Sequence, residues 1–335
     1  RKSPVKKKTN LKRYHSGFLL IFGKIKQKET NMKSDNLKES RNIEDRRGQS
    51  YSQSSGNSNL GGGILQILLS PGSFKSKIVL ILLLVLLGGG GASLGGLFGN
   101  GTSSQPYQST QVTRTNKTHV DDADAQFVSK VLATTEDHWH KVFQAEGRTY
   151  QEPKLVFYTG RTKTGCGVGQ ASAGPFYCPT DKKIYLDMSF YKELTTKYKA
   201  SGDFAMAYVI AHEVGHHVQN ELGILGKYHR MQQGLSEKER NAISVRIELQ
   251  ADYLAGVWAR SIQDRNLLDI GDIEEAMNAA HAVGDDTLQE QAYGYSVPDS
   301  FTHGTSEQRM RWFKRGYHYG DLQHGDTFSL SDSEL

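Results

Sequence analysis

Cysteine is scarce in this chain, and its scarcity excludes one common kind of metal site. Only Cys166 and Cys178 occur among 335 residues. Two cysteines cannot build a four-cysteine zinc site, and their spacing is not that of a metal-binding knuckle. On spacing alone the pair can still be two metal ligands, a redox pair or a disulfide.

Acidic and aromatic residues are few in residues 1–77. Lysine and arginine number 17 there against 5 aspartates and glutamates, a net charge of +12 that leaves −7 for residues 78–335, because the whole chain carries +5. Such a segment buries too little apolar surface to offset its chain entropy, so we predict a disordered tail. Its few aromatic residues do not alternate with the charges as base stacking requires, so we expect no nucleic-acid partner.

An initiator methionine is also missing at the start. The chain begins with Arg1, and its first methionine is Met32. We therefore expect residues 1–31 to be an upstream extension of the gene model. The apolar run Phe18–Phe22 within it is too short to span a bilayer or to act as the apolar part of a signal peptide.

One apolar run is long enough to cross a membrane. Residues 78–98 contain no charged residue, and about 20 apolar residues span the hydrocarbon core of a bilayer. A buried helix is the alternative, but the four glycines at 88–91 would form a poor helix in water. We predict a single transmembrane helix at 78–98.

The charges beside this run predict its orientation. Basic residues precede it, so the positive-inside rule keeps residues 1–77 in the cytoplasm and places the chain after it outside the bacterial cytoplasmic membrane. Residues 99–118, rich in Ser, Thr, Gln and Gly, are predicted to be a flexible tether to a domain at 119–335. In a domain outside the membrane, a disulfide becomes the favoured state of the two cysteines.

The chemistry centres on the stretch His212-Glu-Val-Gly-His216. Two histidines four residues apart on a helix lie one turn apart on the same face, so both imidazoles can reach one metal ion. A catalytic zinc site uses three protein ligands and leaves a position for water. Glu213 lies about 100° from His212 around the helix, where it can accept a proton from that water without binding the metal. His217 points away from His216, and we expect it to be packed or to support the site.

The sequence around the motif is that of a helix with a buried stripe. By chance alone the motif would arise in roughly one such chain in fifty, so its surroundings matter. Apolar and small residues recur at steps of three and four positions, and Asp203 is predicted to cap the N-terminus. The stripe consists of Phe204, Ala207, Tyr208, Ala211, Gly215, Val218 and Leu222.

A second helix supplies the third ligand in this interpretation. A capping box at Ser236–Glu239 begins a helix that runs to about Ile262 and carries Glu248 and Asp252 on one face. Alanines beside that face let another helix approach closely. We predict that Glu248 binds the metal and that Asp252 orients a ligand imidazole. The alternative is an ordinary charged helix face.

The rest of the domain is predicted to be mixed α and β structure. An amphipathic helix over 121–146 is followed by strands at Lys154–Tyr158 and Lys183–Leu186. The glycine-rich loop at 164–178 does not follow the strand-to-helix pattern of a phosphate-binding loop, so we do not expect a nucleotide site. The predicted class is α+β, a mainly helical domain with a small β-sheet.

Near the C-terminus, His303 precedes a short basic helix at 306–315. A zinc peptidase needs a donor that stabilises the oxyanion, and His303 is the first candidate for it, with Tyr293 and Tyr295 as weaker ones. The alternative is a loop histidine that caps the following helix.

Four separated motifs together resemble one bacterial family, the neutral zinc metallopeptidases, whose membrane-anchored members share this layout. The resemblance runs from about Asn42 to Phe328. It implies a zincin-like fold of the gluzincin kind, with ligands that map to the two motif histidines and to Glu248. This chain has Tyr253 where relatives often carry a cysteine, so it lacks a second disulfide. The motifs are His212–His217, Glu248–Asp252, Gly174–Pro179 and His303–Arg309.

These features predict a zinc-dependent endopeptidase acting on a peptide or protein substrate. Zn2+ would lower the pKa of its water toward about 7, and Glu213 would accept a proton as that water attacks a peptide carbonyl. The strand near Gly174–Tyr177 is expected to pair with an extended substrate. The alternative is a catalytically inactive, membrane-tethered zinc-binding or scaffold protein. Glu213 favours the enzyme, because a structural site has no use for an unligated carboxylate beside two histidines.

Overall fold

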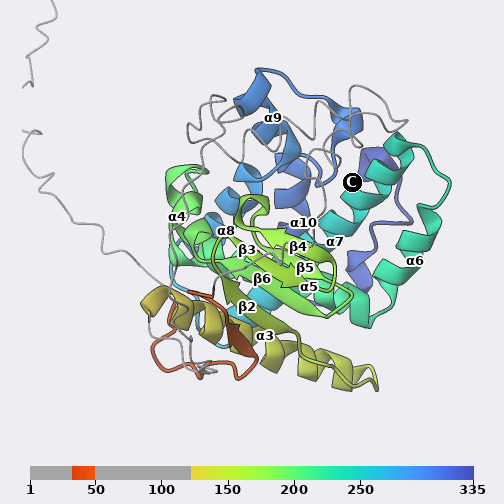
Figure 1. Ribbon diagram of the computed structural model, residues 1–335. Coiled ribbons are helices and arrows are strands. Elements are labelled where there is room, and N and C mark those ends of the chain that lie inside the picture. Colours follow the sequence, from red (N-terminus) through yellow and green to blue (C-terminus); the bar gives the residue numbers. More distant parts are fainter. Residues whose placement is uncertain (1–31, 50–121) are drawn as a thin grey trace, which may run out of the picture. The chain divides into compact units, whose positions relative to one another are not determined.

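The computed structural model describes residues 32–49 and 122–335 (Figure 1). The predicted transmembrane helix at 78–98, the tether at 99–118 and the extension at 1–31 lie outside the described residues. Within the two described ranges, no helix is both long and apolar enough to span a bilayer.

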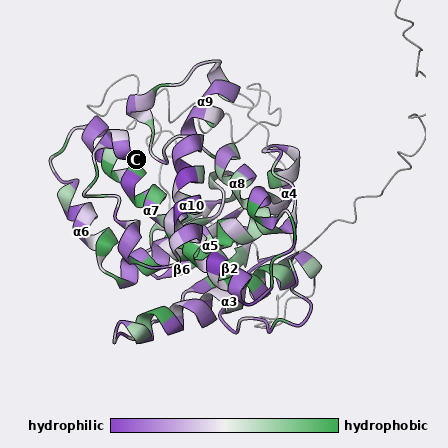
Figure 2. Ribbon diagram, turned by 180° about the vertical axis from the view of Figure 1, so that it is seen from behind, coloured by the Kyte–Doolittle hydropathy of each residue, from purple (hydrophilic) through white to green (hydrophobic). Residues whose placement is uncertain are grey.

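Helices make up most of the described structure, with a small mixed sheet among them (Figure 1), so the predicted α+β class is confirmed. The amphipathic helix expected over 121–146 is present, and Figure 2 shows apolar and polar residues side by side along it. The helices are α3 (Ala123–Ala145), α4 (Ser189–Thr196), α5 (Asp203–Glu221), α6 (Ile224–Met231), α7 (Glu237–Asp264), α8 (Asp272–Ala282), α9 (Asp285–Tyr293) and α10 (Ser306–Tyr319).

The strands form a four-stranded sheet and a separate hairpin. They are β1 (Ile43–Asp45), β2 (Lys154–Tyr158), β3 (Arg161–Thr164), β4 (Gly167–Gln170), β5 (Phe176–Cys178) and β6 (Lys183–Asp187). The sheet has the order β1-β2-β6-β5. Its first three strands run parallel, and β5 is antiparallel to β6 at one edge. β3 and β4 make the hairpin. The two predicted strands, β2 and β6, are thus neighbours in the sheet.

β1 overturns part of the prediction that residues 1–77 are a disordered tail, because residues 32–49 belong to the domain. Ile43 pairs with Leu155 of β2, whose amide donates to the carbonyl of Asn42 at 2.8 Å. The prediction averaged composition over a long segment. A three-residue strand is instead held by backbone hydrogen bonds, which depend little on composition. The domain therefore includes chain upstream of its predicted start at residue 119.

The pairing of β1 with β2 also corrects the predicted membrane topology. Paired strands lie on the same side of a membrane, because their backbone hydrogen bonds join them directly. A single crossing between β1 and α3 would separate the two strands. The single-pass arrangement, with residues 1–77 inside and residues 119–335 outside, is therefore incompatible with this sheet. β1 shares one side with the rest of the domain.

α5 lies at the centre of the helices, in contact with α3, α7 and α8 (Figure 1). Two glycines set the spacing of the helices around the site. At Gly215 of α5, a Cβ would lie 2.9 Å from the carbonyl oxygen of Ala251 on α7. At Gly316 of α10, a Cβ would lie 1.9 Å from the carbonyl oxygen of Tyr253. Both helices therefore pack with their backbones close to α7, which brings their side chains within reach of one another.

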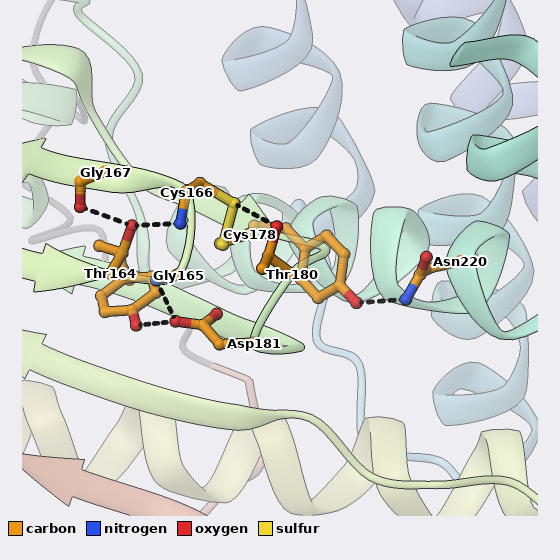
Figure 3. The surroundings of a disulfide bond; sticks show 10 residues. Thr164, Gly165, Cys166, Gly167, Cys178, Thr180, Asp181 and Asn220 are labelled. Carbon is orange, nitrogen blue, oxygen red and sulfur yellow. Dashed lines mark hydrogen bonds between the residues drawn. A yellow bond between two sulfur atoms is a disulfide. The ribbon is translucent and has the colours of Figure 1, made fainter. Parts of the chain in front are cut away.

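The expected disulfide between Cys166 and Cys178 is present (Figure 3). It joins the turn of the β3–β4 hairpin to β5, with the two Cα atoms 5.8 Å apart. Next to Cys178, the hydroxyl of Tyr177 accepts a hydrogen bond from the Asn220 side chain of α5 at 3.0 Å. The edge strand is thus tied both to the hairpin and to the helix that carries the two motif histidines.

Candidate metal centre

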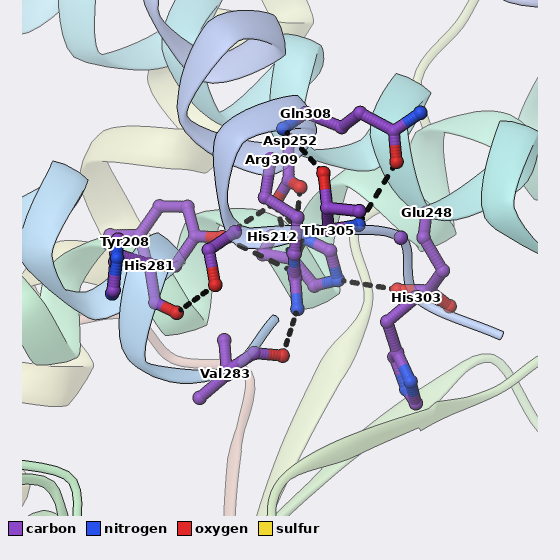
Figure 4. Close-up of polar contacts among 12 residues, drawn as sticks. Tyr208, His212, Glu248, Asp252, His281, Val283, His303, Thr305, Gln308 and Arg309 are labelled. Carbon is purple, nitrogen blue, oxygen red and sulfur yellow. Dashed lines mark hydrogen bonds and ion pairs between the residues drawn. The ribbon is translucent and has the colours of Figure 1, made fainter. Parts of the chain in front are cut away.

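His212, His216 and Glu248 converge where α5 packs against α7; Figure 4 shows His212 beside Glu248. Their ligand atoms all lie within 4.8 Å of one another. His212 Nε2 is 3.1 Å from one carboxylate oxygen of Glu248, and His216 Nε2 is 3.5 Å from the other. Two imidazole nitrogens and a carboxylate oxygen are a donor set that zinc favours. The structure thus brings the three predicted ligands together.

The local sequence explains how the two helices begin. On α7 the capping box at Ser236 forms as predicted. On α5 the prediction that Asp203 is the N-cap is wrong, because Gly202 occupies the cap position and Asp203 is the first helical residue. The free amide of Phe204 donates instead to the Glu275 carboxylate of α8 at 3.1 Å. A cap supplied by another helix cannot be recognised from the local sequence.

Asp252 is fully buried and organises one side of the centre (Figure 4). Its carboxylate accepts from His212 Nδ1 at 2.8 Å, from the Tyr208 hydroxyl at 2.6 Å and from Arg309 at 2.9 and 3.0 Å. A hydrogen bond at Nδ1 leaves the Nε2 lone pair of His212 available toward Glu248. Although burial opposes ionisation, Arg309 and His212 lower the pKa of Asp252 to about 2. This is the geometry that an imidazole-orienting carboxylate requires.

The charges at the centre favour the charged forms of His212 and Glu248. Burial opposes the charged form of His212, yet Asp252 and Glu248 raise its pKa to about 10. Burial likewise opposes ionisation of Glu248, but His216 and His303 hold its pKa well below the ordinary value. The carboxylates beside His212 thus favour a positive charge where the three predicted ligands meet.

Arg309 is a site residue that the sequence analysis left without a role. Its guanidinium is buried against Asp252 and also donates to the Tyr208 hydroxyl at 3.2 Å. Burial opposes its charge, but Asp252 and Tyr208 raise its pKa well above the ordinary value. A signal was available in the sequence. Arg309 precedes Trp312 and Phe313 by three and four positions, which places it on the apolar face of its helix.

His216 is oriented by Gln219, which the sequence analysis also missed. Nδ1 of His216 is 3.0 Å from Gln219 Oε1, and Gln219 Nε2 donates to the carbonyl of Ile247 on α7 at 2.8 Å. Both ligand imidazoles are therefore held through Nδ1, which directs Nε2 toward Glu248. Glu213 lies next to His212 on α5 and is only 7% exposed, so little bulk water reaches its carboxylate.

His217 contacts the sheet edge, in line with its expected packing role. Its Nε2 donates to the carbonyl of Gln151 at 2.6 Å, and its Nδ1 is 3.0 Å from the Tyr177 hydroxyl of β5. Burial lowers its pKa, so the ring stays neutral near pH 7. His217 thereby fixes the position of β5 relative to α5.

His303 lies beside Glu248 with its side chain about half exposed (Figure 4). Its Nδ1 is 3.2 Å from the carboxylate of Asp285, which also accepts the backbone amide of His303 at 2.6 Å. Loss of water opposes its charge, but Glu248 and Asp285 raise the pKa of His303. The helix after it is capped by Thr305, so His303 does not act as the cap.

The two tyrosines named as weaker candidates contact each other. The rings of Tyr293 and Tyr295, at the end of α9 and just beyond it, face each other with centroids 6.3 Å apart. Tyr295 is 63% exposed. Within the described residues, neither ring contacts a metal ligand.

Comparison with known proteins places these residues in a family. The model of the family described as "Putative neutral zinc metallopeptidase" matches residues 32–328. The uncharacterized protein YpfJ of Escherichia coli K12 is 49% identical over 300 residues, which cover 90% of this chain and 100% of the relative. The uncharacterized protein Rv2575 of Mycobacterium tuberculosis H37Rv is 43% identical over 194 residues, 55% of this chain and 64% of the relative. No solved structure matches. The chain belongs to the putative neutral zinc metallopeptidase family.

Proposed function

We propose that this protein is a zinc-dependent endopeptidase with His212, His216 and Glu248 as its zinc ligands. The observation that carries the proposal is the convergence of these three donors within 4.8 Å, with Glu213 next to His212 on the same helix. Each imidazole is fixed by a second partner, so the donors are preorganised for an ion. Zinc bound there supplies a Lewis acid for the peptide carbonyl and a more acidic water.

Glu213 is the general base in this mechanism. Its carboxylate takes the proton that water releases as the water attacks the peptide carbonyl, and it then passes that proton to the leaving amine. Burial of Glu213 suits this task, because a carboxylate shielded from bulk water transfers its proton within the site.

His303 donates a hydrogen bond to the carbonyl oxygen, which becomes an oxyanion when water adds to the carbonyl carbon. Its pKa is raised by Glu248 and Asp285, which favours the charged, donating form near neutral pH. Asp285 accepts from Nδ1 and leaves Nε2 of His303 to face the substrate. His303 is thus the hydrogen-bond donor to the oxyanion, and a His303→Ala change would remove it.

An extended peptide substrate pairs with the outer edge of β5. β5 is the terminal strand of the sheet order β1-β2-β6-β5, so one of its edges has no strand partner within the described residues. Main-chain hydrogen bonds to such an edge bind peptides with little regard to sequence. Tyr177 and His217 connect this strand to α5, which supports a zincin-like arrangement of sheet edge and motif helix.

The domain works outside the cytoplasm in this proposal. The disulfide between Cys166 and Cys178 supports the location, because such bonds persist mainly in oxidising compartments. Residues 32–49 then lie on the outer side as well, since β1 belongs to the same sheet.

The test compares Glu213→Gln with the parent on a peptide library. We expect Glu213→Gln to bind one zinc ion and to cleave about 10²–10⁴-fold more slowly, the usual contribution of a general base. Glu237→Gln, an exposed glutamate in the first turn of α7, is the matched control and should cleave like the parent. If Glu213→Gln keeps both zinc and full activity, the mechanism is wrong; if the zinc-loaded parent cleaves no peptide, the protein is a zinc-binding scaffold.

A further inference from the structure

A second group of potential ligands lies at the other end of α5. Carboxylate oxygens of Asp203, Asp272 and Glu275 all lie within 4.8 Å of one another. Asp203 and Asp272 are the first residues of α5 and α8, and Glu275 follows on α8. Asp203 precedes His212 by nine residues, about 13 Å along the helix, so this group is separate from the zinc ligands.

The surroundings of Asp272 are separate evidence that this group binds a ligand. Its side chain is completely buried, and its Oδ1 has no hydrogen-bond partner. Its other oxygen accepts the amide of Asp269 at 2.8 Å. A buried carboxylate oxygen without a donor is costly, because it loses its hydration and gains nothing in return. A cation among the three carboxylates would remove that cost.

Helix capping does not balance all of the negative charge of the three carboxylates. Glu275 accepts the Phe204 amide, and Asp203 accepts the Met32 amide at 3.3 Å. The N-termini of α5 and α8 add roughly half a positive charge each, against three carboxylates. About two negative charges remain when all three are ionised, and one divalent cation balances them.

Lys33, a basic neighbour of Asp272, donates its hydrogen bond elsewhere. Lys33 is close enough to Asp272 to lower its pKa. Its ammonium, however, donates to the carbonyl of Asn266 at 3.4 Å. The lysine therefore offsets part of the charge from a distance and does not pair with a carboxylate of the group.

The absence of a side chain at Gly202 leaves space for the Glu275 carboxylate. A Cβ at this position would lie 1.9 Å from the carboxyl carbon of Glu275 and 2.0–2.2 Å from its oxygens. The residue also has a φ of +103°, which side chains rarely adopt. The Glu275 carboxylate is thus seated against bare backbone at the start of α5.

We propose that Asp203, Asp272 and Glu275 bind a calcium ion that joins the N-terminus of α5 to α8. The donors are all carboxylate oxygens, which select hard cations. Calcium accepts flexible shells of six to eight oxygens at about 2.3–2.6 Å, whereas magnesium needs a near-ideal octahedral shell and dehydrates reluctantly. Because α5 carries the two motif histidines, the ion stabilises the helix on which the zinc centre is built.

The test uses the full chain, loaded with zinc and freed of calcium. We expect calorimetric titration with CaCl2 to show one calcium ion per chain beyond the zinc. At a hundredfold excess over the Kd, Tm should rise by about 5 °C or more. MgCl2 at the same concentration should have a much smaller effect. These readouts do not depend on peptidase activity, so they test the calcium site separately from the proposed function.

Two variants and a control make the test specific. Asp272→Asn and Glu275→Gln should each lower calcium affinity at least tenfold while leaving the zinc content unchanged. Glu275→Gln is the variant of choice if Asp272→Asn does not fold, because Glu275 is only partly buried. Glu274→Gln changes the same charge on the exposed side of α8 and should bind calcium like the parent. The proposal is overturned if the parent shows no calcium binding, if Glu275→Gln binds as tightly as the parent, or if magnesium binds as well as calcium.

Discussion

The two ends of α5 gather carboxylates under opposite electrostatic conditions. At the zinc end, Glu248 and Asp252 lie among histidines and a buried arginine, and their pKa values are lowered. At the N-terminal end, Asp203 and Glu275 face each other and Asp272, and their pKa values are raised. The first group is already compensated by protein cations, and the second is not. The second group therefore carries a negative charge that a bound cation can balance.

The largest loss of stability is expected from removing the arginine that balances the Asp252 carboxylate at the zinc end. Arg309→Met leaves the Asp252 carboxylate buried without its cation, and removal of one partner from a buried pair costs about 3–5 kcal/mol. Denaturant unfolding of the metal-free protein measures this loss of stability. Arg311→Met, an exposed arginine on the same helix, should change stability by less than about 0.5 kcal/mol. Equal losses in both variants would show that the pair with Asp252 is not what stabilises α10.

A smaller effect is expected from separating the two helices that carry the zinc ligands. Gly215→Ala places a methyl group 2.9 Å from the Ala251 carbonyl oxygen, so α5 and α7 must move apart. Overpacking of this kind costs about 1–3 kcal/mol, and we expect zinc affinity to fall about tenfold in a competition titration. Gly226→Ala on α6 is the control, because its new Cβ would meet only the flexible end of Arg230, at 3.5 Å. Unchanged zinc affinity in Gly215→Ala would mean that the crossing does not set the ligand geometry.

The mildest test varies pH at the N-terminal end. Burial and repulsion by neighbouring carboxylates raise the pKa of Asp203 and Asp272 to about 6 and that of Glu275 to about 7. These folded-state values exceed the unfolded ones, so the three groups favour the calcium-free fold when protonated, and that stability is lost as pH rises from about 4 to about 7. Calcium should therefore raise Tm little at pH 5 and most at pH 8. The other charged or titratable residues near the three carboxylates are Lys33, Asp124, Tyr191, Asp269 and Glu274.

The Glu275→Gln variant gives this pH test its control. It removes the group with the highest pKa of the three, so the difference between pH 5 and pH 8 should shrink. A calcium effect of the same size at both pH values in the parent would contradict the assignment of the ion to these carboxylates.

Much of the zinc centre could be predicted because its pattern is local. The helical repeat alone puts His212 and His216 on one face and Glu213 beside them. Glu248 and Asp252 were also predictable, since their four-residue spacing and the alanines around them indicate a helix face that meets another helix. Gln219 was missed, although it lies three residues from His216 on the same helix, because glutamine is rarely considered as a partner of a ligand imidazole.

The tail could not be predicted in this way. Averaged over residues 1–77, composition hides residues 32–49, which hold four of the five acidic residues of that segment. There β1 pairs with β2 across more than a hundred intervening residues. Strand pairing depends on backbone groups that every residue carries, so composition gives almost no signal for it. The predicted single-pass topology failed for the same reason, because it treated everything before residue 78 as one segment.

The sequence by itself determined the chemistry of the donors: two histidines and a glutamate at helical spacing, an adjacent glutamate, and a pair of cysteines. Only the tertiary structure decided what surrounds them. It placed Arg309 against Asp252, gave the Phe204 amide its acceptor from α8, and brought Asp272 and Glu275 next to Asp203. The physical reason is that residue spacing along a helix fixes which side chains share a face. Contacts between helices depend instead on close approach at glycines such as Gly215. That approach can be judged only when the helices are packed together.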